Sequence, residues 1–264
     1  PILSIKKCLE DQRILISDIN FVAVNNNFFS NLYNKFKYLI KNRPYFNFYL
    51  ERFKNLNKKK NILKILANNF GRLNSHCKLI SIDHHLSHLS SAYYDSPFKN
   101  SVNLSVDAFG NFSSASWGLA KNNVIKIDDR IIFPHSLGIF YEAFTQFLGF
   151  NNFVDEYKVM GLSSYGKPTE NNKFKNIINL KKNGKFELNI KYFNHHKIDS
   201  SYSWNNTSPK TSIILNKNIE KLFGPPVMSG TILQDFHKNL ASSVQYQYEK
   251  TLFHILNYIY DKYK

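Results

Sequence analysis

The stretch that most constrains the fold is residues 80–94, Ile-Ser-Ile-Asp-His-His-Leu-Ser-His-Leu-Ser-Ser-Ala-Tyr-Tyr. Its start continues an apolar, β-rich run and predicts a strand over Cys77–Ile82 that stops at Asp83. Its remainder repeats apolar residues at three- and four-residue intervals, which predicts a helix that reaches Tyr94. The junction between strand and helix therefore gathers Asp83 with several histidines.

Three histidines stand at this junction: His84, His85 and His88. His84 and His88 are four residues apart, so on a helix they share one face, with Cβ atoms about 6 Å apart. This is the usual way in which a helix presents two imidazoles to one metal ion. The alternative is that the histidines are satisfied by backbone or solvent at the helix start, and a short motif alone does not separate the two readings.

Length and composition exclude several classes of protein. The 264 residues suffice for one large domain or two modest ones. The chain has no run of about 18 apolar residues, so no transmembrane helix and no membrane partner are predicted, and its amino end does not resemble a signal peptide. Cys8 and Cys77 exclude a disulfide framework and a Cys-rich zinc site. We expect a cytoplasmic location, and the missing initiator Met predicts that the chain begins inside a gene product.

The chain is strongly basic, with a formal net charge of +16. One interpretation is a surface that binds nucleic acid or phosphate. However, the lysines are scattered, arginine is scarce, and Asn, Ile, Phe and Tyr are abundant, as AT-rich codons would produce. We therefore favour compositional drift over a nucleic-acid surface, although a positive field would still help to gather an anionic substrate.

Apolar spacing predicts mainly helices in the first 70 residues. In chain order we expect a helix over Ile2–Leu9, a buried strand over Ile19–Val24, and helices over Phe28–Ile40, Phe48–Phe53 and Ile62–Phe70. Pro44 interrupts the aromatic region, and Gly71 is the expected C-cap of the last helix. The aromatic stripe of this region is expected to pack against a core rather than to form a groove or partner surface.

The next segment predicts a turn at residues 95–98 and then a three-stranded meander. Its strands are expected over Val102–Val106, Ser113–Leu119 and Val124–Ile132, with Asp107 at the first turn. Ser136 then caps a helix over Leu137–Leu148 that ends at Gly149.

The last hundred residues carry weaker signals. Residues 155–168 are expected to be a glycine-punctuated loop whose backbone approaches a ligand, with Lys158 and Lys167 within reach of phosphate. Residues 185–190 predict a strand, and the pair His195 and His196 is expected in a solvated loop rather than in a metal site. Thr231–Tyr260 predicts one long amphipathic helix. Motifs of serine hydrolases, P-loop proteins and dinucleotide-binding proteins are missing from the sequence.

Several motifs, taken in order, resemble the nodulation-factor and antibiotic O-carbamoyltransferases, the NodU/CmcH family. They are the run from His84 to Phe98, Val106-Asp, Phe133-Pro-His-Ser-Leu-Gly, Glu156-Tyr-Lys-Val-Met-Gly-Leu, Tyr165-Gly-Lys-Pro and Phe223-Gly-Pro-Pro. Several motifs in register are far more specific than any one of them.

The resemblance implies an α/β, actin/Hsp70-like (ASKHA) fold built from two ribonuclease-H-like halves. Residues 1–98 would be the remainder of the first half, with a helical insertion. Residues 99–264 would start the second half, with an insertion at about 151–230. In this family carbamoyl phosphate and ATP yield carbamoyladenylate in a separate YrdC-like domain, and the actin-like domain passes the carbamoyl group to an acceptor hydroxyl.

The resemblance also implies a metal site. Carried over by motif, the ligands are His84, His88 and Asp107, and the metal is iron in the best-known members, although Zn or Mn would suit the same ligands. Asp107 and Gly110 would line the nucleotide side of the cleft, with Lys158 and Gly161 nearby. The expected partners are thus a nucleotide and a small-molecule hydroxyl acceptor.

This chain departs from the family pattern in places. Ala108-Phe-Gly-Asn stands where the family has Gly-Val-Gly-Glu, so an acidic group is missing at Asn111, and Ser163-Ser replaces Ala-Pro. The opening Gly-rich turn, the later Gly-Gly turn, a fourth metal ligand and the YrdC-like domain would lie outside the chain. We therefore expect an internal piece that is inactive when isolated.

Two other functions remain open on the sequence. A DHH-type phosphoesterase would fit Asp83-His84-His85 after a strand, but such enzymes also need an Asp-x-Asp that this sequence lacks. A non-catalytic binding module, acting on RNA through the positive charge, is the other alternative. The residues do not identify the acceptor.

Overall fold

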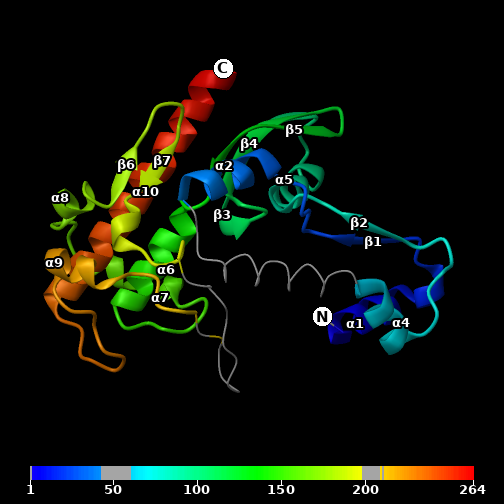
Figure 1. The fold of residues 1–264 in the computed structure, drawn as a ribbon, viewed down its shortest axis with the longest axis horizontal. Helices are drawn as coiled ribbons and strands as arrows, with labels where there is room; N and C mark the ends of the chain where they lie inside the picture. The colour runs from blue at the N-terminus through cyan, green and yellow to red at the C-terminus, as the bar shows by residue number, and fades with distance from the viewer. Residues whose placement is uncertain (1, 43–60, 198–208, 210) are drawn as a thin grey trace. The chain divides into compact units, whose positions relative to one another are not determined.

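The computed structural model describes residues 2–42, 61–197, 209 and 211–264 and shows a mixed α/β protein (Figure 1). It divides into two compact units, Pro1–Ser87 and His88–Lys264. The predicted domain limits rest on the family resemblance and stay a prediction.

The first unit is organised around two parallel strands. Strand β1 (Phe21–Val24) pairs with β2 (Lys78–Ser81), and the Ile82 amide donates to the Val24 carbonyl just beyond the pair. The other elements in the described part of this unit are α1 (Ile2–Gln12), η1 (Ile16–Asp18), α2 (Leu32–Asn42) and α4 (Ile62–Phe70). Gly71 ends α4 with a φ of 95°, which confirms the predicted cap.

Burial in the first unit differs from the prediction. Strand β1 is not buried: among the described residues it pairs with β2 alone, and the side chain of Phe21 is largely exposed. The aromatic helix starts only at Leu32, and the stripe is not packed: Tyr33 is 75% exposed and Phe36 is 64% exposed. The expectations for Pro44 and Phe48–Phe53 lie outside the described residues.

The second unit begins with most of helix α5 (His84–Tyr94) and an antiparallel meander. Strands β3 (Asn100–Gly110), β4 (Ser113–Lys121) and β5 (Val124–Ile132) pair in the order β3-β4-β5. Two-residue turns at Asn111-Phe112 and Asn122-Asn123 have positive φ at every position, as type I′ hairpin turns require. The predicted meander is thus confirmed.

Helix α6 (Leu137–Phe147) lies at the centre of the core of the second unit. Its buried aromatic residues contact Phe174 and Phe223, and α10 (Asp235–Tyr263) packs against α6 and α7 (Glu156–Ser163) (Figure 1). The other elements that the structure describes here are α8 (Asn171–Phe174), β6 (Ile178–Leu180), β7 (Phe186–Leu188), η2 (Ile190–Tyr192), η3 (Lys217–Ile219) and α9 (Glu220–Phe223). The predicted helix after Ser136 is confirmed, and so is the long helix near the carboxyl end, although it starts at Asp235 and not at Thr231.

One segment of the second unit was predicted wrongly. Residues 155–168 are not a loop throughout, because α7 occupies Glu156–Ser163 and buries Val159 in the core. Gly166, which follows α7, packs its backbone closely against helix α10. A Cβ at Gly166 would lie 2.1 Å from the carbonyl oxygen of Lys238. None of the described helices combines the length and apolar character of a membrane span.

Candidate metal centre

Asp83 sets the start of the helix that carries the histidines. It lies two residues after the end of β2 at Ser81, its Oδ1 accepts from the Leu86 amide at 3.1 Å, and its carbonyl accepts from the Ser87 amide at 3.0 Å. These are the bonds of an N-cap residue. The division between the two units falls at Ser87, but α5 continues unbroken through it, so the helix itself places His84 one turn before His88.

Asp107 lies in strand β3, not at the turn where the sequence predicted it. The pairing with β4 is regular up to Val106 and resumes only at Gly110, so Asp107 opens an irregular segment of the strand. Its own Oδ1 accepts from the Ala108 amide at 2.6 Å. Such irregularities re-aim side chains.

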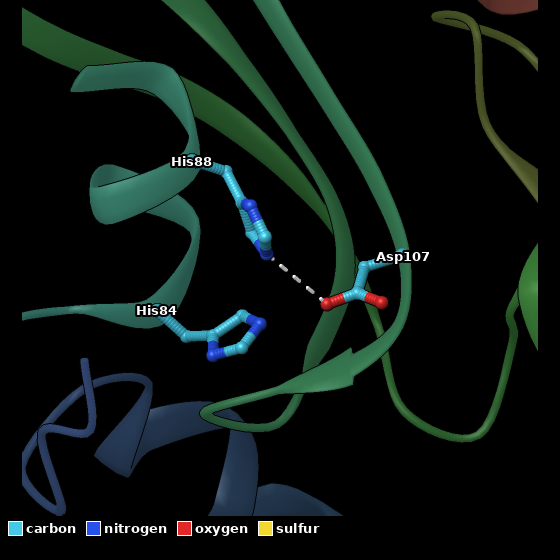
Figure 2. A group of neighbouring side chains, drawn as sticks. All are labelled: His84, His88 and Asp107. Atoms are coloured by element: carbon cyan, nitrogen blue, oxygen red, sulfur yellow. Dashed lines mark ion pairs between the residues drawn. The ribbon is translucent and has the colours of Figure 1, made fainter. Parts of the chain in front are cut away.

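The three predicted ligands form one group (Figure 2). His88 Nε2 lies 3.4 Å from Asp107 Oδ2, and one ligand atom from each of His84, His88 and Asp107 lies within 4.8 Å of the others. Figure 2 shows both imidazoles, from successive turns of α5, on the side of the helix that faces Asp107. The side chains of His88 and Asp107 are 49% and 33% exposed, so solvent reaches the group.

The group fits a divalent transition metal. Two imidazole nitrogens and a carboxylate oxygen suit Fe, Zn or Mn. Ligand atoms bound at about 2.1 Å to one ion lie roughly 3.0–3.4 Å apart, so the widest separation has to close by one to two ångströms. Side-chain rotation at a partly exposed site accommodates such a change. Three protein ligands would leave coordination positions open to a substrate.

The other predicted site residues lie on different elements. Gly110 ends β3 and is buried, and its carbonyl accepts from the Ser113 hydroxyl at 3.1 Å. Lys158 and Gly161 are both in α7. Lys158 forms an ion pair with Asp155 at 2.7 Å, and this hydrogen bond raises the pKa of the ammonium group. A Cβ at Gly161 would meet no atom within 4 Å, so the helix surface there is open.

The pair His195 and His196 is buried, which corrects the prediction of a solvated loop. The Nε2–H group of His195 donates to the Pro134 carbonyl at 2.8 Å. Its ring packs against the rings of Phe109, Phe133 and Phe193. Burial lowers the pKa of His195 to about 4, and the nearby His196 and His135 act in the same direction.

This burial predicts a loss of stability in mild acid. The pKa of His195 is about 4 in the folded chain and ordinarily 6.5, so the unfolded chain binds the proton more readily between these values. Stability is therefore complete above pH 6.5 and falls as pH drops toward 4. Between pH 7 and pH 5 the free energy of unfolding should fall by about 2 kcal/mol. Urea unfolding at both pH values measures this change.

His195→Gln is the matched variant, because glutamine keeps an N–H donor for the Pro134 carbonyl but cannot ionise. Its midpoint should change less between pH 7 and pH 5 than that of the parent chain. Equal changes in both proteins would show that His195 does not carry the effect.

A comparison with known protein families covers all the residues of the candidate metal centre. The family model described as carbamoyltransferase N-terminus matches residues 23–264, which include all three candidate ligands. The nodulation protein NolNO of Sinorhizobium fredii is 30% identical over 196 residues, covering 73% of this chain and 25% of that protein. The uncharacterized protein sll1178 of Synechocystis is 34% identical over 187 residues, covering 70% of this chain and 28% of that protein.

A shorter similarity concerns the nodulation protein NolO of Bradyrhizobium diazoefficiens. It is 39% identical over 89 residues, which cover 33% of this chain and 16% of that protein. Together with the two longer matches, this means that the matched part of this chain spans 16% to 28% of the length of these curated relatives.

Proposed function

This chain belongs to the carbamoyltransferase N-terminus family, and we propose on that basis that it contributes to an O-carbamoyltransferase site. The proposed reaction moves a carbamoyl group from carbamoyladenylate, formed from carbamoyl phosphate and ATP, to an acceptor hydroxyl. The observation that carries the proposal is the group of His84, His88 and Asp107, whose ligand atoms lie within 4.8 Å of one another. The motif resemblance implies these same three residues.

We also propose the actin/Hsp70-like fold for the domain to which the chain belongs. The parallel pair β1–β2, the helix α5 that follows β2, and the meander β3-β4-β5 support this assignment. In such a fold, side chains at strand ends line the ligand cleft. Asp83, two residues beyond the end of β2, and Asp107, near the end of β3, fit that rule.

In the proposed site, His84, His88 and Asp107 hold a divalent metal ion, with iron favoured. Such an ion would act as a Lewis acid that orients phosphate and carbamoyl oxygens. The imidazoles supply neutral nitrogen ligands and Asp107 supplies negative charge. Gly110, Lys158 and Gly161 are proposed to lie near the nucleotide. The open surface at Gly161 leaves room for its approach, and the ammonium of Lys158 would face phosphate on release from Asp155.

The transfer step balances without an oxidant or reductant. The acceptor oxygen forms a bond to the carbamoyl carbon, the bond between that carbon and the adenylate oxygen breaks, and AMP leaves. The proton of the hydroxyl passes to a base. The open side of the metal group is where we place the adenylate.

The test measures the transfer directly. We expect the full-length gene product to move the carbamoyl group of labelled carbamoyl phosphate to a hydroxyl acceptor, with release of AMP, only when ATP and a divalent metal are present. A panel of sugars and other small hydroxyl compounds serves as acceptor. The chain of residues 1–264 alone should bind metal without catalysing transfer.

Removal of the metal with a chelator, followed by its return, is the control. AMP release that is unchanged by the chelator would contradict metal assistance. Hydrolysis of a phosphodiester by the metal-loaded protein, without use of carbamoyl phosphate, would instead indicate a phosphoesterase.

A further inference from the structure

The amino end of α6 lies directly against the irregular segment of β3 that begins at Asp107. Ser136, the N-cap of α6, accepts from the Ile139 amide at 3.1 Å through its hydroxyl. The same hydroxyl donates to the carbonyl of Asp107, also at 3.1 Å. A serine hydroxyl has one donor and two acceptor positions, so both bonds can form at once. One buried oxygen atom thus joins the first turn of α6 to the backbone of a candidate metal ligand.

Gly138 makes the second contact between these elements. A Cβ at this position would lie 2.8 Å from the Ala108 nitrogen, 2.9 Å from the Ala108 Cα and 3.1 Å from the carbonyl carbon of Asp107. All three are backbone atoms, so no side-chain rotation could relieve the overlap. Only glycine allows α6 to approach β3 this closely.

The contact at Gly138 bears on the carboxylate itself. The Ala108 amide, against which Gly138 packs, donates to Asp107 Oδ1 at 2.6 Å. The other carboxylate oxygen, Oδ2, is the one that lies 3.4 Å from His88 Nε2 (Figure 2). A displacement of Ala108 would therefore turn the carboxylate away from its position beside His88.

We propose that Ser136 and Gly138 are positioning residues, which fix Asp107 in the orientation that metal binding requires. Ser136 holds the Asp107 carbonyl, and Gly138 sets the place of the amide that holds the carboxylate. This inference rests on the proposed metal site and adds two residues to it. Outer-shell residues of this kind typically change metal affinity 10- to 100-fold when mutated.

The chain offers a matched control in Ser114. Its hydroxyl donates to the His135 carbonyl at 2.6 Å, so it holds the segment next to Ser136 from strand β4. Ser114 and Ser136 are both buried. Ser114→Ala and Ser136→Ala therefore each remove a buried serine hydroxyl bonded to a backbone carbonyl, but only Ser136 is bonded to Asp107.

The experiment titrates the purified chain with Co²⁺, whose visible absorption reports the number and geometry of its ligands. We expect Gly138→Ala and Ser136→Ala to weaken Co²⁺ binding by about 10- to 100-fold and to alter the absorption spectrum. Ser114→Ala should bind within about twofold of the parent chain and keep its spectrum. Circular dichroism establishes that each variant is folded.

The outcomes separate the inference from the proposal on which it rests. A parent chain that binds no Co²⁺ would overturn the metal site and the inference together. A parent chain that binds Co²⁺, with Gly138→Ala or Ser136→Ala folded and unchanged in both affinity and spectrum, would overturn the inference alone. If Gly138→Ala fails to fold, Ser136→Ala decides, since it adds no atoms. An equal loss in Ser114→Ala would show a general effect of packing and would also count against the inference.

Discussion

His88→Ala is expected to abolish stoichiometric binding of a divalent metal ion, where the parent chain should hold about one ion. The substitution removes the imidazole that lies 3.4 Å from Asp107 Oδ2 and leaves two ligands, His84 and Asp107. Loss of a direct ligand should weaken binding by more than the roughly 10- to 100-fold that loss of an outer-shell group causes. Metal content after equilibrium dialysis against iron, zinc or manganese measures the effect.

The fold should tolerate this change. The side chain of His88 is 49% exposed, and alanine favours the helical conformation, so the free energy of unfolding should change little. His76→Ala, at an exposed histidine of the same chain, is the control for nonspecific binding. If His88→Ala retained one ion per chain, or if His76→Ala lost as much metal, the ligand assignment would be wrong.

Asp107→Asn complements the test, because it separates charge from shape. The asparagine side chain can still accept from the Ala108 amide through its oxygen. The negative charge is lost, and an amide is a weaker ligand for a transition metal than a carboxylate. A large loss of metal in both Asp107→Asn and His88→Ala would support one shared ion.

The parts of the site that follow local rules could be predicted from the sequence. Asp83 ends a β-rich run and caps a helix, and the spacing of His84 and His88 places them on one face. Ser136 was predicted as a cap from its position before an apolar helix, and it is one. In each case the decisive bonds join residues within four positions of one another.

The placement of Asp107 depends on more than its own neighbours. The sequence predicted that the strand would end there, since a polar residue follows an apolar run. In the structure β3 continues to Gly110, because pairing with β4 resumes after an irregular segment. The contact with Gly138, thirty-one residues later, helps to fix that segment, and no local pattern reveals it.

Helix α7 and His195 show the same limit. Glycine and proline predicted a loop over residues 155–168, but burial of Val159 against the core stabilises a helix instead. The polar surroundings of His195 predicted exposure, whereas the acceptor of its hydrogen bond, Pro134, comes from a distant segment. Tertiary contacts decided both cases.

The second large effect is expected at Phe144, in the middle of α6. Its side chain is fully buried, and its ring lies 5.1 Å from that of Phe174 and 5.6 Å from that of Phe223, measured between centroids. Phe144→Ala should therefore lower the free energy of unfolding by about 3–5 kcal/mol, through lost burial and the cavity that remains. The midpoint and slope of urea unfolding measure this change.

Two variants make the prediction at Phe144 specific. Phe144→Leu retains most of the buried volume and should cost clearly less than Phe144→Ala. Phe253→Ala removes the same ring from α10 at a position that is 58% exposed, and should cost less than about 1 kcal/mol. Equal losses for Phe144→Ala and Phe253→Ala would contradict the assigned core. Phe144 lies in the same helix as Gly138, and Ser136 caps that helix. If a folded Phe144→Ala chain bound Co²⁺ like the parent chain, the first turn of α6 would hold Asp107 without the packing around Phe144.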